Sequence, residues 1–259
     1  MRVLFHCGFH KTGTSSVQAA LSAVRPMLPA DVGIVLQPDI PRLCEMARAL
    51  SVEPDSDLGA FETLASERLF DLGTGRALLV ISAEDLGGLL PGRRGLTRYA
   101  RTADLMVCLH RACVAAFGAE VEVAYYFSTR DAAPWLASLW WQNLRSTRMT
   151  LDAATFAETF QTAADLTAIV DEVRAALPVC QVHYQALEDC ADQPAAPLLR
   201  LAGLDALLPH LPDARANARP QAEGIADVFL ALNRSGLPDG FVRETKKSVL
   251  RKLRRMSQG

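Results

Sequence analysis

The chain has 259 residues, of which 50% are hydrophobic and 22% are charged, and its formal net charge is −2. This balance excludes a disordered chain, and the 16 Gly and 14 Pro exclude a collagen-like or low-complexity architecture. A charge so close to neutral argues against a generally basic nucleic-acid binder, so no nucleic-acid partner is expected. The length suits one large domain. Because no internal repeat or long linker interrupts the sequence, we expect a single domain over residues 1–259.

Strand-like and helix-like patterns alternate along the chain. Strands are predicted at residues 3–7, 77–82, 120–128 and 180–184. Helices are predicted at 17–24, 58–72, 98–117, 134–147, 152–161 and 163–176, and from about 194 onward with breaks at 209–220 and 235–240. Strands separated by helices predict a three-layer α/β fold, with a mostly parallel sheet of about 4–5 strands flanked by helices. Ligands bind such sheets beyond the carboxyl ends of the strands, so a site is expected after residues 7, 82 and 129.

Cysteine usage and hydropathy indicate a cytoplasmic protein. The six cysteines form no CxxC pair and no zinc-finger spacing with His, so we expect buried reduced thiols; they are Cys7, Cys44, Cys108, Cys113, Cys180 and Cys190. The apolar run at residues 3–5 is too short for a signal peptide. No apolar run reaches the ~18–20 residues that a membrane helix needs.

The segment after the first predicted strand has the composition of an anion site. Gly8 and Gly13 allow tight turns, Lys11 supplies a positive charge, and hydroxyls stand at positions 12, 14, 15 and 16, directly before a helix. A helix N-terminus offers free N–H groups and the positive end of the helix dipole. The nucleotide-triphosphate loop G-x-x-x-x-G-K-[ST] would require Lys where this chain has Thr14, which counts against a kinase or an ATPase.

Residues 9–16, Phe-His-Lys-Thr-Gly-Thr-Ser-Ser, resemble the 5′-phosphosulfate loop of sulfotransferases that use 3′-phosphoadenosine 5′-phosphosulfate (PAPS). A second element also resembles that family: Arg130 follows the strand 120–128, and Ser138 lies eight residues later on the next helix. The resemblance is to short bacterial members and implies a P-loop-like fold. It also implies transfer of a sulfuryl group from PAPS to a hydroxyl or amine, with release of 3′,5′-ADP. The acceptor, whether a glycan, a lipid head group or a small molecule, is left open.

The same resemblance implies residue roles. Lys11 would offset charge on the leaving phosphate, the loop would bind the 5′ end of PAPS, and Arg130 with Ser138 would bind the 3′-phosphate. The implied cofactor-binding set is Lys11, Thr12, Gly13, Thr14, Ser15, Ser16, Arg130 and Ser138. No metal is expected, as in that family. Taken alone, the hydroxyls are also ordinary helix caps, and Arg130 is a candidate ion-pair partner for a neighbour such as Asp131.

Transfer to a hydroxyl needs a base that accepts the proton of the acceptor. Some carbohydrate sulfotransferases use a Glu, so Glu84, which follows the strand 77–82, is the first candidate and His10 is the alternative. Glu84 could instead be a first-turn carboxylate that only stabilises a helix dipole. His6 is predicted to be structural. Core packing is predicted for three tryptophans, with stacking on an adenine or acceptor as the alternative: Trp135, Trp140 and Trp141.

A basic, helical tail is predicted at about 240–259. Residues 243–255 carry seven basic side chains and one acidic one, and apolar residues recur on one helical face. Four interpretations fit: a packed helix with a solvated basic face, a contact to an anionic membrane surface, a contact to an acidic acceptor, or a part of the PAPS pocket. For the whole chain, two alternatives to a sulfotransferase stay open. One is a phosphotransferase with a degenerate loop and Mg²⁺; the other is a non-enzymatic nucleotide-binding or membrane-surface module.

Overall fold

The computed structural model describes residues 1–213 and 224–256, so the parts of the predicted loop and tail at 214–220 and 257–259 lie outside the described residues. Five strands form one sheet of order β2-β3-β1-β4-β5, in which all neighbouring strands are parallel. The strands are β1 (Arg2–His6), β2 (Val32–Leu36), β3 (Leu78–Ser82), β4 (Glu122–Thr129) and β5 (Gln181–Ala186). The predicted parallel α/β sheet is therefore confirmed.

Helices connect the strands and cover the sheet. The α-helices are α1 (Thr14–Val24), α2 (Pro41–Leu50), α3 (Gly59–Gly73), α4 (Thr102–Phe117), α5 (Ala132–Ser146), α6 (Ala153–Thr159), α7 (Leu166–Ala176), α8 (Ala196–Leu201), α9 (Ile225–Arg234) and α10 (Asp239–Met256). Short 3₁₀ helices lie between them: η1 (Arg25–Met27), η2 (Gln37–Asp39), η3 (Glu84–Gly87), η4 (Gln161–Ala164), η5 (Leu187–Cys190) and η6 (Asp205–His210).

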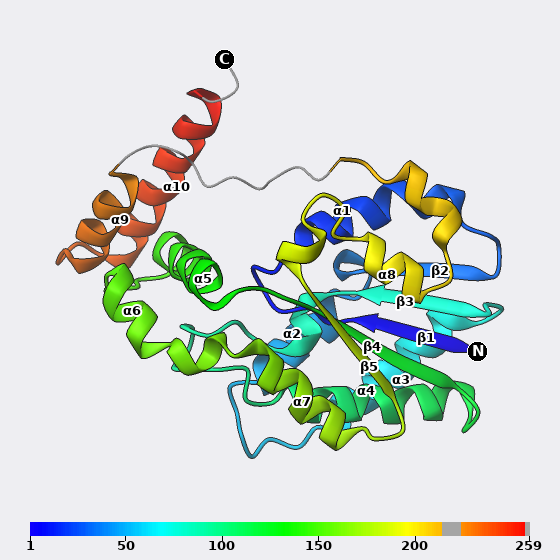
Figure 1. Ribbon diagram of the computed structural model, residues 1–259. Helices are drawn as coiled ribbons and strands as arrows, with labels where there is room; N and C mark the ends of the chain where they lie inside the picture. Colours follow the sequence, from blue (N-terminus) through cyan, green and yellow to red (C-terminus); the bar gives the residue numbers. More distant parts are fainter. Residues whose placement is uncertain (214–223, 257–259) are drawn as a thin grey trace.

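Each face of the sheet is covered by its own set of helices (Figure 1). Leu4 of β1 packs with apolar residues of α1 and α8 on one face. Its neighbours Val3 and Phe5 point to the other face, where they join the larger core with α2, α3, α4 and α7. This alternation follows from the two-residue period of a strand. It makes the three layers that the sequence predicts, with β1 at the centre of the sheet.

The sequence patterns did not predict β2 or α2. β2 has only five residues, VGIVL, and Gly33 lowers its strand propensity. Glycine is required there, because a Cβ at Gly33 would lie 2.7 Å from Cδ of Arg76 and 2.8 Å from Cδ1 of Leu79. α2 starts at Pro41 and presents only a narrow buried stripe to the core.

The helices α9 and α10 form a lobe that packs against α5 (Figure 1). Trp141 of α5 stacks on Phe229 of α9, with ring centroids 5.7 Å apart. Lys246 of α10 is buried and donates hydrogen bonds to the carbonyl oxygens of Leu144 and Thr147, at 2.9 and 2.6 Å. Lys246 therefore caps the C-terminal end of α5, where a cation is favourable for the helix dipole.

The tail is thus a packed helix, as the first of the four interpretations has it. Its basic face is solvated only in part, since Arg243 and Lys247 are exposed but Lys246 is buried. All six cysteines lie in the described part of the chain as free thiols, and four of them are buried as predicted, whereas Cys180 and Cys190 are half-buried. Among the described residues, no helix is both long enough and apolar enough to cross a membrane.

Candidate active site

The loop between β1 and α1 is shaped by close packing at Gly8 and by two residues in the left-handed region. A Cβ at Gly8 would lie 2.2 Å from the hydroxyl oxygen of Ser128, so only glycine fits. Lys11 has φ 71° and Gly13 has φ 90°. Gly13 is the N-cap residue of α1, and no side chain in the described chain caps this helix. The N–H groups of Thr14 and Ser15 are therefore available to a ligand, whereas that of Ser16 donates to the Gly13 carbonyl oxygen at 2.9 Å.

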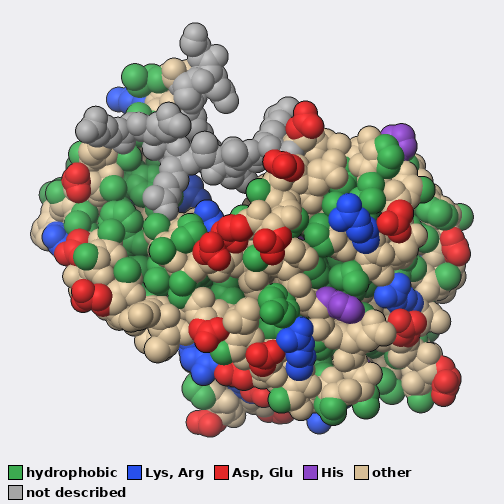
Figure 2. Space-filling model, viewed as in Figure 1, with side chains coloured by type: hydrophobic (Ala, Val, Ile, Leu, Met, Phe, Trp, Pro, Cys, Tyr) green, Lys and Arg blue, Asp and Glu red, His purple; other side chains and the backbone are tan. Residues whose placement is uncertain are grey.

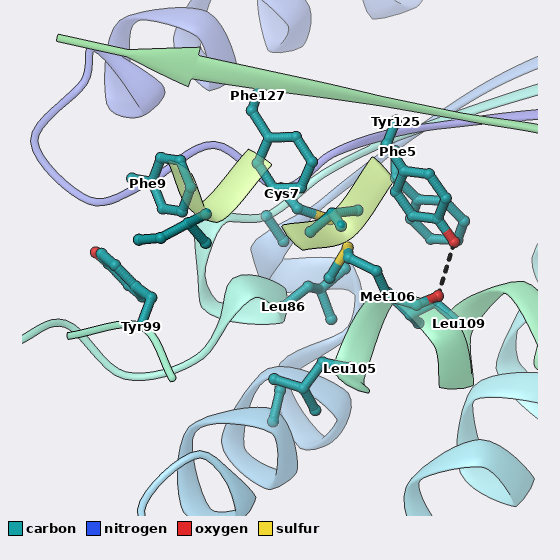
Figure 3. Packing of buried hydrophobic residues seen from close by; sticks show 14 of the residues in the cluster. Phe5, Cys7, Phe9, Leu86, Tyr99, Leu105, Met106, Leu109, Tyr125 and Phe127 are labelled. Carbon is teal, nitrogen blue, oxygen red and sulfur yellow. Dashed lines mark hydrogen bonds between the residues drawn. The ribbon is translucent and has the colours of Figure 1, made fainter. Parts of the chain in front are cut away.

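Buried contacts on both sides of Lys11 fix the loop, and Figure 3 shows those of Phe9. The Phe9 ring packs between Tyr99 and Phe127, with centroid distances of 5.0 and 5.5 Å. The Thr12 hydroxyl is buried, donates to the Phe9 carbonyl oxygen at 2.5 Å, and lies 2.7 Å from the Ser128 hydroxyl. The Thr12 side chain is therefore used inside the protein, and only its backbone remains for the predicted part in cofactor binding.

A pocket of about 910 Å³ brings the other predicted residues together. It lies where the carboxyl ends of β1, β3 and β4 meet, and a hollow is visible there between the α9–α10 lobe and the body of the molecule (Figure 2). The predicted residues that line it are His10, Lys11, Gly13, Thr14, Ser15, Ser16, Glu84, Arg130 and Ser138. These positions come from three separate strand ends, as the parallel sheet requires.

Arg130 connects the two halves of the pocket. Its guanidinium donates a 3.1 Å hydrogen bond to the Lys11 carbonyl oxygen, while its buried Nε has no hydrogen-bond partner among the described residues. Its ion-pair partner is Glu188 of η5, at 3.7 Å, rather than Asp131, the neighbour considered from the sequence. The Glu188 carboxylate also accepts from the backbone N–H of Asp131, at 3.3 Å.

Glu84 opens η3 and is half-buried at the pocket wall. Its carboxylate accepts a 2.5 Å hydrogen bond from the amide of Gln18, which lies on α1. This bond ties the carboxylate to the helix that begins after the loop of residues 7–13. Glu84 is therefore a pocket carboxylate on a different strand end from Lys11, and one of its oxygens is held by an amide.

Asp85, the next residue, is a buried hub. Its carboxylate contacts the Nε2 of His10 at 3.0 Å, the amide of Gln37 at 2.5 Å, and the guanidinium of Arg48. Burial alone would raise the pKa of Asp85, but the hydrogen bond from His10 and the positive charge of Arg48 outweigh it, and the pKa is lowered. The sequence patterns missed this hub, because its partners are 37 to 75 residues away.

His10 is less suited than Glu84 to be the base. Its Nε2 is occupied by Asp85, and its Nδ1 lies 3.0 Å from the Tyr99 hydroxyl, which also accepts from the His10 backbone N–H at 3.1 Å. With Asp85 as an obligate acceptor, the network places the proton on Nε2 and leaves Nδ1 to accept from Tyr99. Both ring nitrogens of His10 thus hold the loop in place.

Gln142 and Arg145 are pocket residues that the sequence analysis did not select. The amide oxygen of Gln142 accepts from Nζ of Lys11 at 3.4 Å and from Nε of Arg145 at 3.1 Å. Both residues could have been found from helical periodicity, since they lie four and seven positions after Ser138 and share its face of α5.

Two structural predictions agree with the geometry. His6 is buried between the hydroxyls of Ser82 and Ser128, and burial lowers its pKa to about 3. None of the three tryptophans lines the pocket: Trp135 donates to the His10 carbonyl, Trp140 donates to the Leu151 carbonyl, and Trp141 stacks on Phe229. Their role in the described structure is packing and support of the loop.

No known family model matches the chain, and no curated protein matches it. Among solved structures, the chain is similar to a sulfotransferase from Alicyclobacillus acidocaldarius, at 19% sequence identity and a TM-score of 0.47, over 89% of this chain and 91% of that chain. We therefore base the function on the residues of the pocket.

Proposed function

We propose that this protein is a sulfotransferase that moves a sulfuryl group from PAPS to a hydroxyl or amine and releases 3′,5′-ADP. The observation that carries the proposal is that one pocket is lined by both the loop at the N-terminus of α1 and the pair Arg130 and Ser138. These elements are more than 100 residues apart in the chain, and each suits a different phosphate of the same nucleotide.

The chemistry of the pocket residues fits such a nucleotide. The uncapped N-terminus of α1 and the charge of Lys11 suit the 5′ end. The guanidinium of Arg130, whose Nε has an ion-pair contact to Glu188 but no hydrogen bond among the described residues, and the hydroxyl of Ser138 suit a second phosphate, because the planar guanidinium fork binds two phosphate oxygens at once. A nucleotide without a 3′-phosphate would leave this second set of groups without a ligand.

PAPS would supply the activated sulfuryl group, and three groups of the chain would catalyse its transfer. Lys11 and the N–H groups of the loop stabilise negative charge as it develops on the phosphate side of the bond that breaks. Glu84 accepts the proton of the attacking hydroxyl, and Gln18 keeps its carboxylate in one orientation.

The direct test is turnover. The purified protein is incubated with PAPS and a panel of hydroxyl and amine acceptors, and the release of 3′,5′-ADP is measured with and without EDTA. We expect acceptor-dependent release that EDTA does not abolish. A metal-dependent transfer from ATP, with no transfer from PAPS, would instead identify a phosphotransferase.

A further inference from the structure

A row of cationic side chains continues from the phosphate loop along α5. Lys11 and Arg145 share the amide oxygen of Gln142, and Arg145 lines the pocket. The next cation is Arg93, whose guanidinium donates a 2.9 Å hydrogen bond to the hydroxyl of Ser146, adjacent to Arg145 on α5. The proposed reaction uses Lys11 and leaves Arg93 and Arg145 without a role.

Arg93 has the properties of an anion-binding group. Its Nε is buried and has no hydrogen-bond partner among the described residues. Burial lowers the pKa of Arg93, and the nearby charges of Arg145 and Arg48 lower it further, while Asp85 and Tyr99 act in the opposite direction. The carboxylate of Asp85 is already shared by Arg48 and His10. An oxyanion beside Arg93 would therefore supply a missing hydrogen-bond acceptor and offset the repulsion between guanidinium groups.

Arg93 does not itself line the pocket, but its place in the chain brings it to the strand end of Glu84, on the acceptor side of the proposed reaction. It lies on the segment that follows β3 and η3, the same strand end that carries Glu84. Tyr99, whose hydroxyl contacts His10, lies near enough to Glu84, Asp85 and Arg93 for their charges to influence its pKa. Arg130 instead follows β4, and Ser138 lies on α5, the helix that also carries Arg145.

We infer that the acceptor is a hydroxyl compound that carries a carboxylate or phosphate group, which Arg93 and Arg145 bind while Glu84 receives the proton of the hydroxyl. This inference rests on the proposed sulfotransferase function and specifies its acceptor class. The planar fork of arginine binds either a carboxylate or a phosphate through two N–H groups. We therefore expect this site to favour anionic acceptors without requiring one particular anion.

Three sugars with one scaffold test this inference: glucose, glucuronate and glucose 6-phosphate differ only at C6. Their binding to the protein saturated with 3′,5′-ADP is measured by calorimetry at matched ionic strength. We expect one or both anionic sugars to bind at least about tenfold more tightly than glucose, the ratio that one charge-assisted hydrogen bond provides. A preference for only one of them identifies which oxyanion fits.

Variants distinguish binding at Arg93 and Arg145 from a general electrostatic attraction between the protein and an anion. Arg93→Gln combined with Arg145→Gln should remove the preference and leave 3′,5′-ADP bound. Arg111→Gln removes one charge from an exposed position on α4, outside the pocket, and should change neither result. Equal binding of the three sugars to wild type, no binding of either anion, or a preference that survives the double variant would overturn the inference. Failure of 3′,5′-ADP itself to bind would instead count against the proposed function.

Discussion

The guanidinium of Arg130 donates a hydrogen bond of 3.1 Å to the backbone carbonyl of Lys11, across 119 residues of sequence. The bond joins the two segments that the sequence singled out for two different phosphates. It also means that Arg130 supports the loop as well as lining the pocket. Substitutions in either segment should therefore be read together with a measurement of stability.

Replacing Lys11 by Ala should lower the rate of sulfuryl transfer roughly 10²–10³-fold, because it removes one charged donor from the transition state. Lys11 has φ 71°, so Lys11→Gly, which has no strain there, serves as a second variant that should lose the same activity. The rate is compared with that of Arg111→Gln, and thermal unfolding is recorded for all three. A variant that transfers at nearly the wild-type rate would remove Lys11 from the mechanism.

Replacing Glu84 by Gln should lower turnover roughly 10²–10⁴-fold, because the amide is not basic. The affinity for 3′,5′-ADP should not change, since Glu84 stands on a different strand end from the nucleotide residues, and the amide oxygen can still accept from Gln18. Glu62→Gln, an equivalent exchange on α3 outside the pocket, is the control. If Glu84→Gln retains turnover, Glu84 is only a first-turn carboxylate of η3.

Replacing Asp85 by Asn should lower the free energy of unfolding at pH 7 by roughly 1–3 kcal/mol, because the buried carboxylate loses its charge-assisted bonds to His10 and to the half-buried Arg48. The pKa of Asp85 is lower in the folded protein than in the unfolded chain. Its contribution is therefore complete above the unfolded pKa of about 4 and is lost as the pH falls through the folded value.

The measurement is urea unfolding at pH 7 and at a series of acidic pH values. The wild type should lose more stability on acidification than Asp85→Asn does. Asp71→Asn, whose ion pair with Arg68 is exposed, should change stability by under about 1 kcal/mol. Parallel pH profiles of the wild type and Asp85→Asn would contradict the role given to this carboxylate.

Replacing Lys246 by Met should lower the free energy of unfolding by about 1–3 kcal/mol, because the carbonyls of Leu144 and Thr147 lose a buried donor. Lys247→Met is a matched control one residue away, where the side chain is exposed and bonds only to Glu244. Denaturant unfolding of the two variants should separate them. Equal stabilities would show that Lys246 does not hold α10 on α5.

The sequence predicted the pocket residues that can be located from the strand that precedes them. The loop after β1, Glu84, and the pair Arg130 and Ser138 each follow a strand that an apolar or β-branched run identifies. The sequence did not predict the hub around Asp85, because Gln37, Arg48 and His10 meet there only through the tertiary fold. For the same reason, the sequence did not predict that both ring nitrogens of His10 have hydrogen-bond partners.

For the fold, too, the sequence predicted some elements and missed others. The strands β1, β3, β4 and β5 were predicted close to their observed positions, whereas β2 was missed because Gly33 interrupts its short apolar run. The tail pattern predicted a helix but not which basic residue is buried. Lys246 is distinguished from Lys247 only by its place over the end of α5, which depends on how the lobe docks.

The central claim is that the pocket binds a nucleotide with both a 5′- and a 3′-phosphate. Calorimetry of the wild type with 3′,5′-ADP and with 5′-ADP tests it without knowledge of the acceptor. We predict at least about tenfold tighter binding of 3′,5′-ADP, because a charge-assisted contact is worth roughly 1.5–3 kcal/mol and about 1.4 kcal/mol corresponds to tenfold. Arg130→Gln should remove most of this difference, whereas Arg111→Gln should retain it. Equal affinities of the wild type for the two nucleotides would contradict the account.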